Sequence, residues 1–217
     1  MSDKKKVWDI AVRVFHWSLV LFFATAYLTG DDADTLHAYA GYIIIGLLGF
    51  RFIWGFIGTR TARFRSFIFS PAETMRYARS FVTRNPIHYI GHNPLGSLMV
   101  FALLLFISLT CWSGLKLYAI EGKGPLAQDV NLVISQAYAD DEHEREGHDK
   151  SEHRFWKDVH ELFANFTLFL VIMHILGAVL ASIVHGENLI KAMITGRRER
   201  VDDQGVHTAS SSVSHDS

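Results

Sequence analysis

The chain has 217 residues, of which 49% are hydrophobic and 20% are charged, and its formal net charge is −1. It contains twelve histidines but a single cysteine, Cys111, which excludes an internal disulfide framework, a four-cysteine iron–sulfur cluster and a structural zinc finger. No Cys-x-x-Cys-His motif occurs, so covalent c-type haem attachment is excluded as well. The near-zero net charge gives no indication of nucleic-acid binding, and no nucleic-acid partner is expected.

Four apolar stretches are long enough to cross a bilayer, whose hydrocarbon core takes about 20 helical residues. They run from about residue 10 to 29, 36 to 58, 95 to 117 and 159 to 185. The first is too long for a signal peptide and lacks a small-residue cleavage site. The sequence therefore predicts an all-α fold, a transmembrane four-helix bundle, in one membrane domain over residues 1–200.

The basic and acidic residues of the connecting segments are separated. Lysine and arginine gather before the first span, after the second span and after the fourth span, which places these segments on the inner, cytoplasmic side with both termini. The link GDDAD and an acidic, histidine-containing loop over residues 121–157 are expected outside. Ser70 and Pro71 open a predicted short interfacial helix that ends near Arg84, and residues 202–217 are expected to be disordered.

Ionisable side chains inside spans are costly, so four histidines require an explanation. His160 and His174 lie 14 residues apart on one predicted helix, which puts them within about 40° of the same face and about 21 Å apart in depth. His37 begins the second span at the outer depth of His160, and His16 lies at the inner depth of His174. We therefore predict two facing histidine pairs at two depths.

Two imidazoles facing each other across a bundle are the axial ligands that a six-coordinate, non-covalent haem requires. The depths predict an inner haem between His16 and His174 and an outer haem between His37 and His160. Tetrahedral zinc fits less well, because each depth offers only two histidines and no cysteine or carboxylate set.

Further residues at these depths are candidates for binding the haem groups. Gly41 and Gly177 would let a flat macrocycle approach the backbone. Arg51, also 14 residues after His37, would face the inner haem, where a buried guanidinium needs an anion such as a haem propionate or a nearby carboxylate. Arg13, one turn before His16, is a second candidate for this role.

These residues resemble the bacterial cytochrome b561 family, including the b-type cytochrome subunits of nickel–iron hydrogenases, over about residues 7 to 200. Arg13, His16 and Trp17 look like the family's Arg-x-x-His-Trp signature, and HELFANFTLFLVIMH is similar to the fourth-helix segment that carries two ligands, here His160 and His174. LHAYAGY, FRFIWGFIGTRTARF and GHNPLG resemble a subgroup often paired with c-type cytochromes.

The resemblance implies a multi-pass protein of the bacterial inner membrane with two haem b groups, passing electrons between the quinone pool of a respiratory chain and a partner. The acidic outer, periplasmic loop indicates a basic partner such as a small c-type cytochrome. Two alternatives stay open: a membrane-anchor cytochrome b subunit of a hydrogenase-like oxidoreductase, and a superoxide:quinone oxidoreductase, against which the acidic loop argues. Whether the chain is itself an enzyme, with quinol or quinone oxidoreductase activity, also stays open.

Six further histidines, in two groups of three, have two interpretations each. A trio in the acidic loop could bind a metal or form a docking surface, but a solvated loop is favoured, because residues five apart share no helical face. Those near the inner span ends are best explained as interfacial residues, with contact to a quinone headgroup or a propionate as the alternative for His92 or Asn93. The first set is His143, His148 and His153, and the second is His88, His92 and His185.

Overall fold

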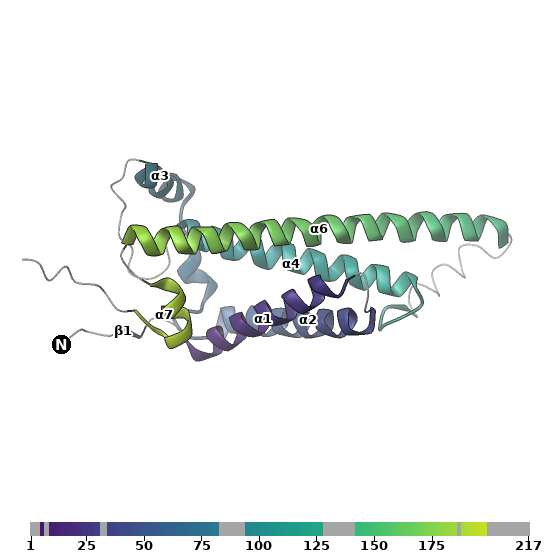
Figure 1. Ribbon diagram of the computed structural model, residues 1–217, viewed down its shortest axis with the longest axis horizontal. Helices are drawn as coiled ribbons and strands as arrows, with labels where there is room; N and C mark the ends of the chain where they lie inside the picture. The colour runs from purple at the N-terminus through teal and green to yellow at the C-terminus, as the bar shows by residue number, and fades with distance from the viewer. Residues whose placement is uncertain are drawn as a thin grey trace, which may run out of the picture.

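The computed structural model describes residues 5–6, 9–30, 34–82, 94–127, 142–185 and 188–198, without side chains for a few of them, 142–149 included. Its bundle consists of four long helices, α1 (Ile10–Leu28), α2 (Asp34–Ile57), α4 (Pro94–Ile120) and α6 (Glu142–His185). Helix α1 packs along α2, helix α4 packs along α6, and α2 contacts α4 between the two pairs (Figure 1). All four are long and apolar enough to cross a membrane, so the predicted all-α class is confirmed.

The outer faces of these helices are strongly apolar. Leu21, Phe56, Leu105 and Ile183, one from each helix, all leave more than half of their surface exposed. In water such a surface would be unfavourable, whereas in lipid it is matched to its surroundings. Helices also satisfy their backbone hydrogen bonds internally, as the hydrocarbon region demands. The protein is therefore a multi-pass membrane protein.

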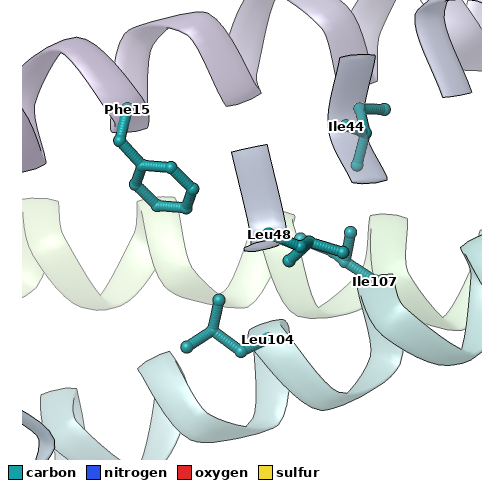
Figure 2. Close-up of a cluster of buried hydrophobic side chains, with 5 residues drawn as sticks. All are labelled: Phe15, Ile44, Leu48, Leu104 and Ile107. Carbon is teal, nitrogen blue, oxygen red and sulfur yellow. The ribbon is translucent and has the colours of Figure 1, made fainter. Parts of the chain in front are cut away.

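A small apolar cluster joins three of the helices. Phe15 of α1, Ile44 and Leu48 of α2, and Leu104 and Ile107 of α4 form one buried cluster (Figure 2). All five side chains are at most 7% exposed. This cluster holds α1 and α2 against α4, and so positions the three helices that α6 faces.

Short elements gather at the end of the bundle where α1 begins. They are β1 (Lys5–Lys6), the 3₁₀ helix η1 (Phe64–Phe67), α3 (Pro71–Val82), α7 (Leu189–Thr195) and β2 (Arg197–Arg198). The two strands pair antiparallel, with Lys5 opposite Arg198, which brings the first and last described segments to the same end (Figure 1). The sequence did not predict α7 or the strand pair. That this basic end faces the cytoplasm remains a prediction.

Local capping explains where these elements begin. The Asp9 side chain accepts a hydrogen bond from the Ala11 N–H at the start of α1, and its other oxygen accepts from Trp54 and Thr59 at the end of α2. Ser70 Oγ accepts from the Glu73 N–H, so the predicted Ser70–Pro71 start of α3 is present. Helix α3 ends at Val82, and residues 83–93 lie outside the described ranges.

Helix α6 begins earlier than its apolar stretch suggests. Residues 142–157, assigned from the sequence to the acidic loop, form the first turns of this helix, which projects beyond the other three (Figure 1). Charged residues are good helix formers and pair along the surface, as Lys157 does with Glu161 at 3.8 Å. Hydropathy locates the membrane-spanning part of a helix but not its polar extension. The rest of the predicted loop from 128 to 141, and the tail, lie outside the described residues.

Glu121, directly after α4, connects this extension to the bundle. Its carboxylate accepts a hydrogen bond from Lys123 at 3.1 Å and lies 3.3 Å from Nε2 of His153. Partial burial acts to raise the pKa of Glu121, but the hydrogen bonds and charges of Lys123 and His153 outweigh it and hold the pKa below its ordinary value of 4.5. The ionised carboxylate is thus the form that stabilises the contact.

A carboxylate with a lowered folded-state pKa stabilises the folded contact above its unfolded pKa, and the contribution is lost as the pH falls through the folded-state value. We expect Glu121→Gln to speed amide hydrogen exchange in residues 150–157 at pH 7 by about two- to fivefold, as for an exposed ion pair. The exchange rates of the variant and of the unaltered protein are compared by mass spectrometry at matched pH. The difference between the two rates should become smaller below pH 4.5. Equal exchange at pH 7 would contradict a stabilising contact.

Candidate haem-binding sites

The four membrane histidines form two facing pairs across the bundle. The rings of His16 on α1 and His174 on α6 have centroids 6.4 Å apart, and those of His37 on α2 and His160 on α6 have centroids 5.9 Å apart. All four side chains are partly buried. Helix α6 contributes one ligand candidate to each pair because 14 residues bring both rings to nearly the same helix face.

These separations fit a metal held between two imidazoles. A metal–imidazole bond is about 2.0–2.1 Å, and the bonded nitrogen lies about 1.1 Å from the ring centre, so two axial rings on one iron have centroids about 6.3 Å apart. Both observed separations lie within half an ångström of this value. Two rings at this distance cannot bond each other directly, and they leave the space of one metal centre between them.

In the outer pair, the Nδ1 nitrogen of each ring is hydrogen bonded. His37 Nδ1 donates to the carbonyl oxygen of Ala26 at 2.8 Å, and His160 Nδ1 donates to that of Thr110 at 3.0 Å. Ser113 Oγ lies 3.2 Å from the same His160 nitrogen. Because a carbonyl only accepts, Nδ1 carries the hydrogen and Nε2 keeps its lone pair for a metal. This is the usual arrangement of a metal-binding histidine.

The inner pair has no such partners. His16 Nδ1 is buried and makes no hydrogen bond within the described part of the chain. No hydrogen bond is formed by the His174 ring among these residues either. A buried, unpartnered ring nitrogen is unfavourable unless a bound group compensates for it. The inner pair therefore fits a site whose polar atoms are completed by a ligand.

The predicted glycines lie beside open space. A Cβ atom added to Gly41 or to Gly177 would meet nothing within 4 Å, which agrees with room for a flat macrocycle. A third glycine, Gly114 on α4, was missed: its added Cβ would lie 2.9 Å from Cε1 of His160. No spacing in the sequence links Gly114 to a histidine 46 residues away on another helix, so only the tertiary structure could reveal this contact.

Arg51 is buried, with 3% of its surface exposed. Its guanidinium carbon lies 4.6 Å from the centre of the Phe64 ring and 5.7 Å from that of Phe67, both in η1. Its Nη1 atom is buried without a hydrogen-bond partner among the described residues. Two aromatic faces attract the charge but offer no hydrogen-bond acceptor of ordinary strength, so the guanidinium retains capacity for an anion.

Arg13 is engaged elsewhere. Its Nε donates to the carbonyl oxygen of Met193 at 3.1 Å, and its Nη2 donates to that of Ile194. These carbonyls belong to the last turn of α7, where a cation is favourable. Arg13 thus links α1 to α7, a contact that the sequence did not predict. Its predicted role toward haem is not tested by this geometry.

Of the other histidines, His153 is the one whose side chain the structure describes. His88, His92 and Asn93 lie outside the described residues, and the side chains of His143, His148 and His185 are not described. His153 contacts Glu121. Within the described ranges, no three histidine, cysteine, aspartate or glutamate side chains come together as a metal site. The two facing pairs are therefore the candidate sites for metal chemistry in this part of the chain.

Comparison with known proteins identifies the family of this chain. The family model for prokaryotic cytochrome b561 matches residues 7–196. Proteins named "Probable Ni/Fe-hydrogenase B-type cytochrome subunit" match from Azotobacter vinelandii (28% identical, covering 91% of this chain and 90% of the relative) and from Bradyrhizobium diazoefficiens (24% identical, covering 89% and 85%). No solved structure matches the chain.

A family match over nearly the whole chain assigns the family and with it the class of cofactor. Cytochromes of this class carry b-type haem, and the residues present fit that group: facing imidazoles at the right separation, free Nε2 atoms in the outer pair and open space beside two glycines. The chain therefore belongs to the prokaryotic cytochrome b561 family and is a multi-pass membrane cytochrome b of electron transport.

Proposed function

We propose that this cytochrome binds two haem b groups, one between His16 and His174 and one between His37 and His160, and passes electrons between the quinone pool and a redox partner at the outer side. The observation that carries the proposal is the pair of ring separations, 6.4 and 5.9 Å. Haem b supplies one-electron chemistry when bound, and the protein positions it and adjusts its potential.

The role of the chain's own residues follows from their places in the bundle. His160 and His174, the α6 residues of the two pairs, lie about 21 Å apart along the helix. Two haem sites at these depths would let electrons cross most of the hydrocarbon core. The apolar cluster of Phe15, Leu48 and Leu104 is proposed to keep water from the space between the helices at the inner depth. Arg51 and the open faces of Gly41 and Gly177 are proposed to hold the macrocycles and their propionates.

An absorption spectrum of the purified protein, with haem quantified per chain, tests this proposal. We expect b-type bands after reduction with dithionite and two haem groups per chain. A chain with no b-type bands would refute haem binding, and a chain with one haem would refute the two-site arrangement. Reduction of the bound haem by a quinol analogue in detergent, and its slowing by a quinone-site inhibitor, test the quinone as electron donor.

The outer partner is proposed to be a small basic c-type cytochrome, because the segment from Asp140 to Glu152 is rich in acidic residues. Opposite charges steer association at low salt, and the Debye length shrinks from about 30 Å at 0.01 M to about 3 Å at 1 M. We expect the second-order rate of electron transfer to such a cytochrome to fall at least about tenfold over this range. The double variant Asp140→Asn, Asp141→Asn should reduce the salt dependence, and a rate insensitive to salt would exclude this partner.

A second candidate is the membrane cytochrome b subunit of a hydrogenase-like complex, which the names of the matched relatives favour. Here a large redox subunit, rather than a diffusing cytochrome, would occupy the outer face. The two candidates are separated by purification in mild detergent from the native membrane. A stable complex with a metal-containing redox subunit supports the second, whereas a free cytochrome with salt-dependent transfer supports the first.

A further inference from the structure

Helix α4 supplies none of the four membrane histidines, but three of its residues contact the ring of His160 on α6. They are Thr110, Ser113 and Gly114, which stand at positions i, i+3 and i+4 and so share one face of α4. Helix α4 packs along α6, which brings this face to the histidine. The outer pair, formed by α2 and α6, therefore has a third helix beside it that contributes contacts but no ligand.

The two polar residues of this face determine which nitrogen of His160 carries the hydrogen. Ser113 Oγ donates its hydrogen to the carbonyl oxygen of Thr110 at 2.9 Å, so toward His160 it can only accept. His160 Nδ1 lies 3.2 Å from this Oγ and 3.0 Å from the Thr110 carbonyl oxygen. Because both neighbours are acceptors, Nδ1 carries the hydrogen and Nε2 keeps its lone pair.

Gly114 lets the ring of His160 lie directly against the backbone of α4. A Cβ atom at this position would lie 2.9 Å from Cε1 and 3.2 Å from Nδ1 of His160, closer than packed side chains approach each other. With a larger residue, the ring would have to move away from α4, and Nδ1 would move away from the Thr110 carbonyl. The absence of a side chain at Gly114 is therefore as necessary for this contact as the two polar groups.

A second contact holds the same face of α4 against α6. The hydroxyl oxygens of Thr110 and Thr167 lie 3.2 Å apart. Thr167 follows His160 by seven residues, or about two turns, so the two residues share one face of α6. The side chains of Ser113 and Thr167 are fully buried. The position of α4 relative to α6 is thus fixed by buried polar contacts near the histidine.

We propose that Thr110, Ser113 and Gly114 form a seat on α4 that positions His160 as a ligand of the outer haem, with Gly114 as the positioning residue whose replacement has the largest effect. The inference rests on the proposed function, because it assumes that the outer pair binds haem. None of the three residues would touch the iron. They act through the ring of His160, by fixing its tautomer and its distance from α4, and groups that orient a metal-bound histidine contribute about 10–100-fold to metal affinity.

The rate of haem loss from the full-length protein tests the seat. His174→Ala is the background, because the proposed function leaves this variant with the outer haem alone. In this background we expect Gly114→Ala to speed the transfer of haem to excess apomyoglobin by about 10–100-fold. We also expect part of the bound haem to become high-spin, because an iron whose axial histidine is displaced is five-coordinate. Electron paramagnetic resonance detects this change of spin state.

Two controls separate positioning of the ring from a general effect on the bundle. Gly46→Ala is the matched substitution, because alanine is the better helix former at both positions and an added Cβ at Gly46 meets nothing within 4 Å. The second control is Gly114→Ala in the His160→Ala background, where the ring that the new Cβ would meet is gone. There we expect the inner haem to be lost at the same rate as from His160→Ala alone.

Ser113→Ala tests the polar part of the seat without adding an atom. It removes one of the two acceptors of His160 and leaves the carbonyl of Thr110 in place. We therefore expect loss of the outer haem to become about two- to fivefold faster, a smaller effect than that of Gly114→Ala. This variant decides the inference if Gly114→Ala does not accumulate as a folded protein.

Haem loss from both Gly114→Ala and Ser113→Ala at the rate of Gly46→Ala would overturn the seat while leaving haem binding intact. Faster loss of the inner haem from Gly114→Ala in the His160→Ala background would also overturn it, because the effect would then not pass through His160. Absence of haem from the unaltered protein would instead refute the proposed function on which the seat rests.

Discussion

His174→Ala is expected to halve the haem content of the protein, from two groups per chain to one, and to leave the outer site filled. His160→Ala should do the opposite. The altered pair would keep only one of the two histidines that would hold a non-covalent haem, while the other pair, about 21 Å away along α6, would keep both of its own. The effect is large because no further histidine among the described residues lies at either depth to substitute.

The pairing can be checked with the partner residues. His16→Ala should lose the same component of the reduced spectrum and of the redox titration as His174→Ala, and His37→Ala should match His160→Ala. His153→Ala is the control, because His153 lies on the same face of α6 as His160 but contacts Glu121 outside the apolar span. Loss of one shared component in both His160→Ala and His174→Ala would contradict two separate sites.

Arg51→Leu is expected to lower the potential of the inner haem and to leave the outer one unchanged. At separations of about 10–15 Å, a unit charge contributes about 1–2 kcal/mol at an effective dielectric constant of about 20. For a one-electron couple this corresponds to a decrease of about 50–70 mV. The guanidinium is buried, and its Nη1 lacks a partner among the described residues, so little solvent screens its charge.

The control for this variant is Arg51→Lys, which keeps the charge but gives up the planar contact with Phe64 and Phe67. We expect the reduction potential of the inner haem in Arg51→Lys to stay close to that of the unaltered protein. A decrease of the same size in both variants would show that packing against the aromatic rings, and not charge, is responsible. An unchanged titration in Arg51→Leu would exclude Arg51 from the electrostatics of the inner site.

Much of the candidate site could be predicted from helical periodicity alone. The 14-residue spacing of His160 and His174 fixes their common face and their difference in depth, and the positions of His16 and His37 within their spans supply the partners. The structure brings these residues together as predicted, at 6.4 and 5.9 Å. Periodicity succeeds here because a membrane restricts helices to nearly parallel packing and sets their depth by length.

Periodicity could not predict what each side chain meets across the bundle. The contact of Arg13 with carbonyls of α7 could not be predicted, because the sequence did not reveal this helix; the role of Arg13 toward haem stays a prediction. The residues next to Gly114 in the sequence do not indicate its role, because that role depends on the ring of His160 on another helix. The early start of α6 was also missed, because a charged helix projecting past the apolar span resembles a loop in hydropathy.

The sequence by itself determined the number of spans, the separation of basic and acidic ends and the four histidines at two depths. These features depend on the order of residues along each helix, and a helix of known pitch converts order into position. The tertiary structure decided which carbonyls orient His37 and His160 and that none orients His16 or His174 within the described residues. Such contacts depend on the rotation and spacing of neighbouring helices, which side-chain packing sets and no single segment encodes.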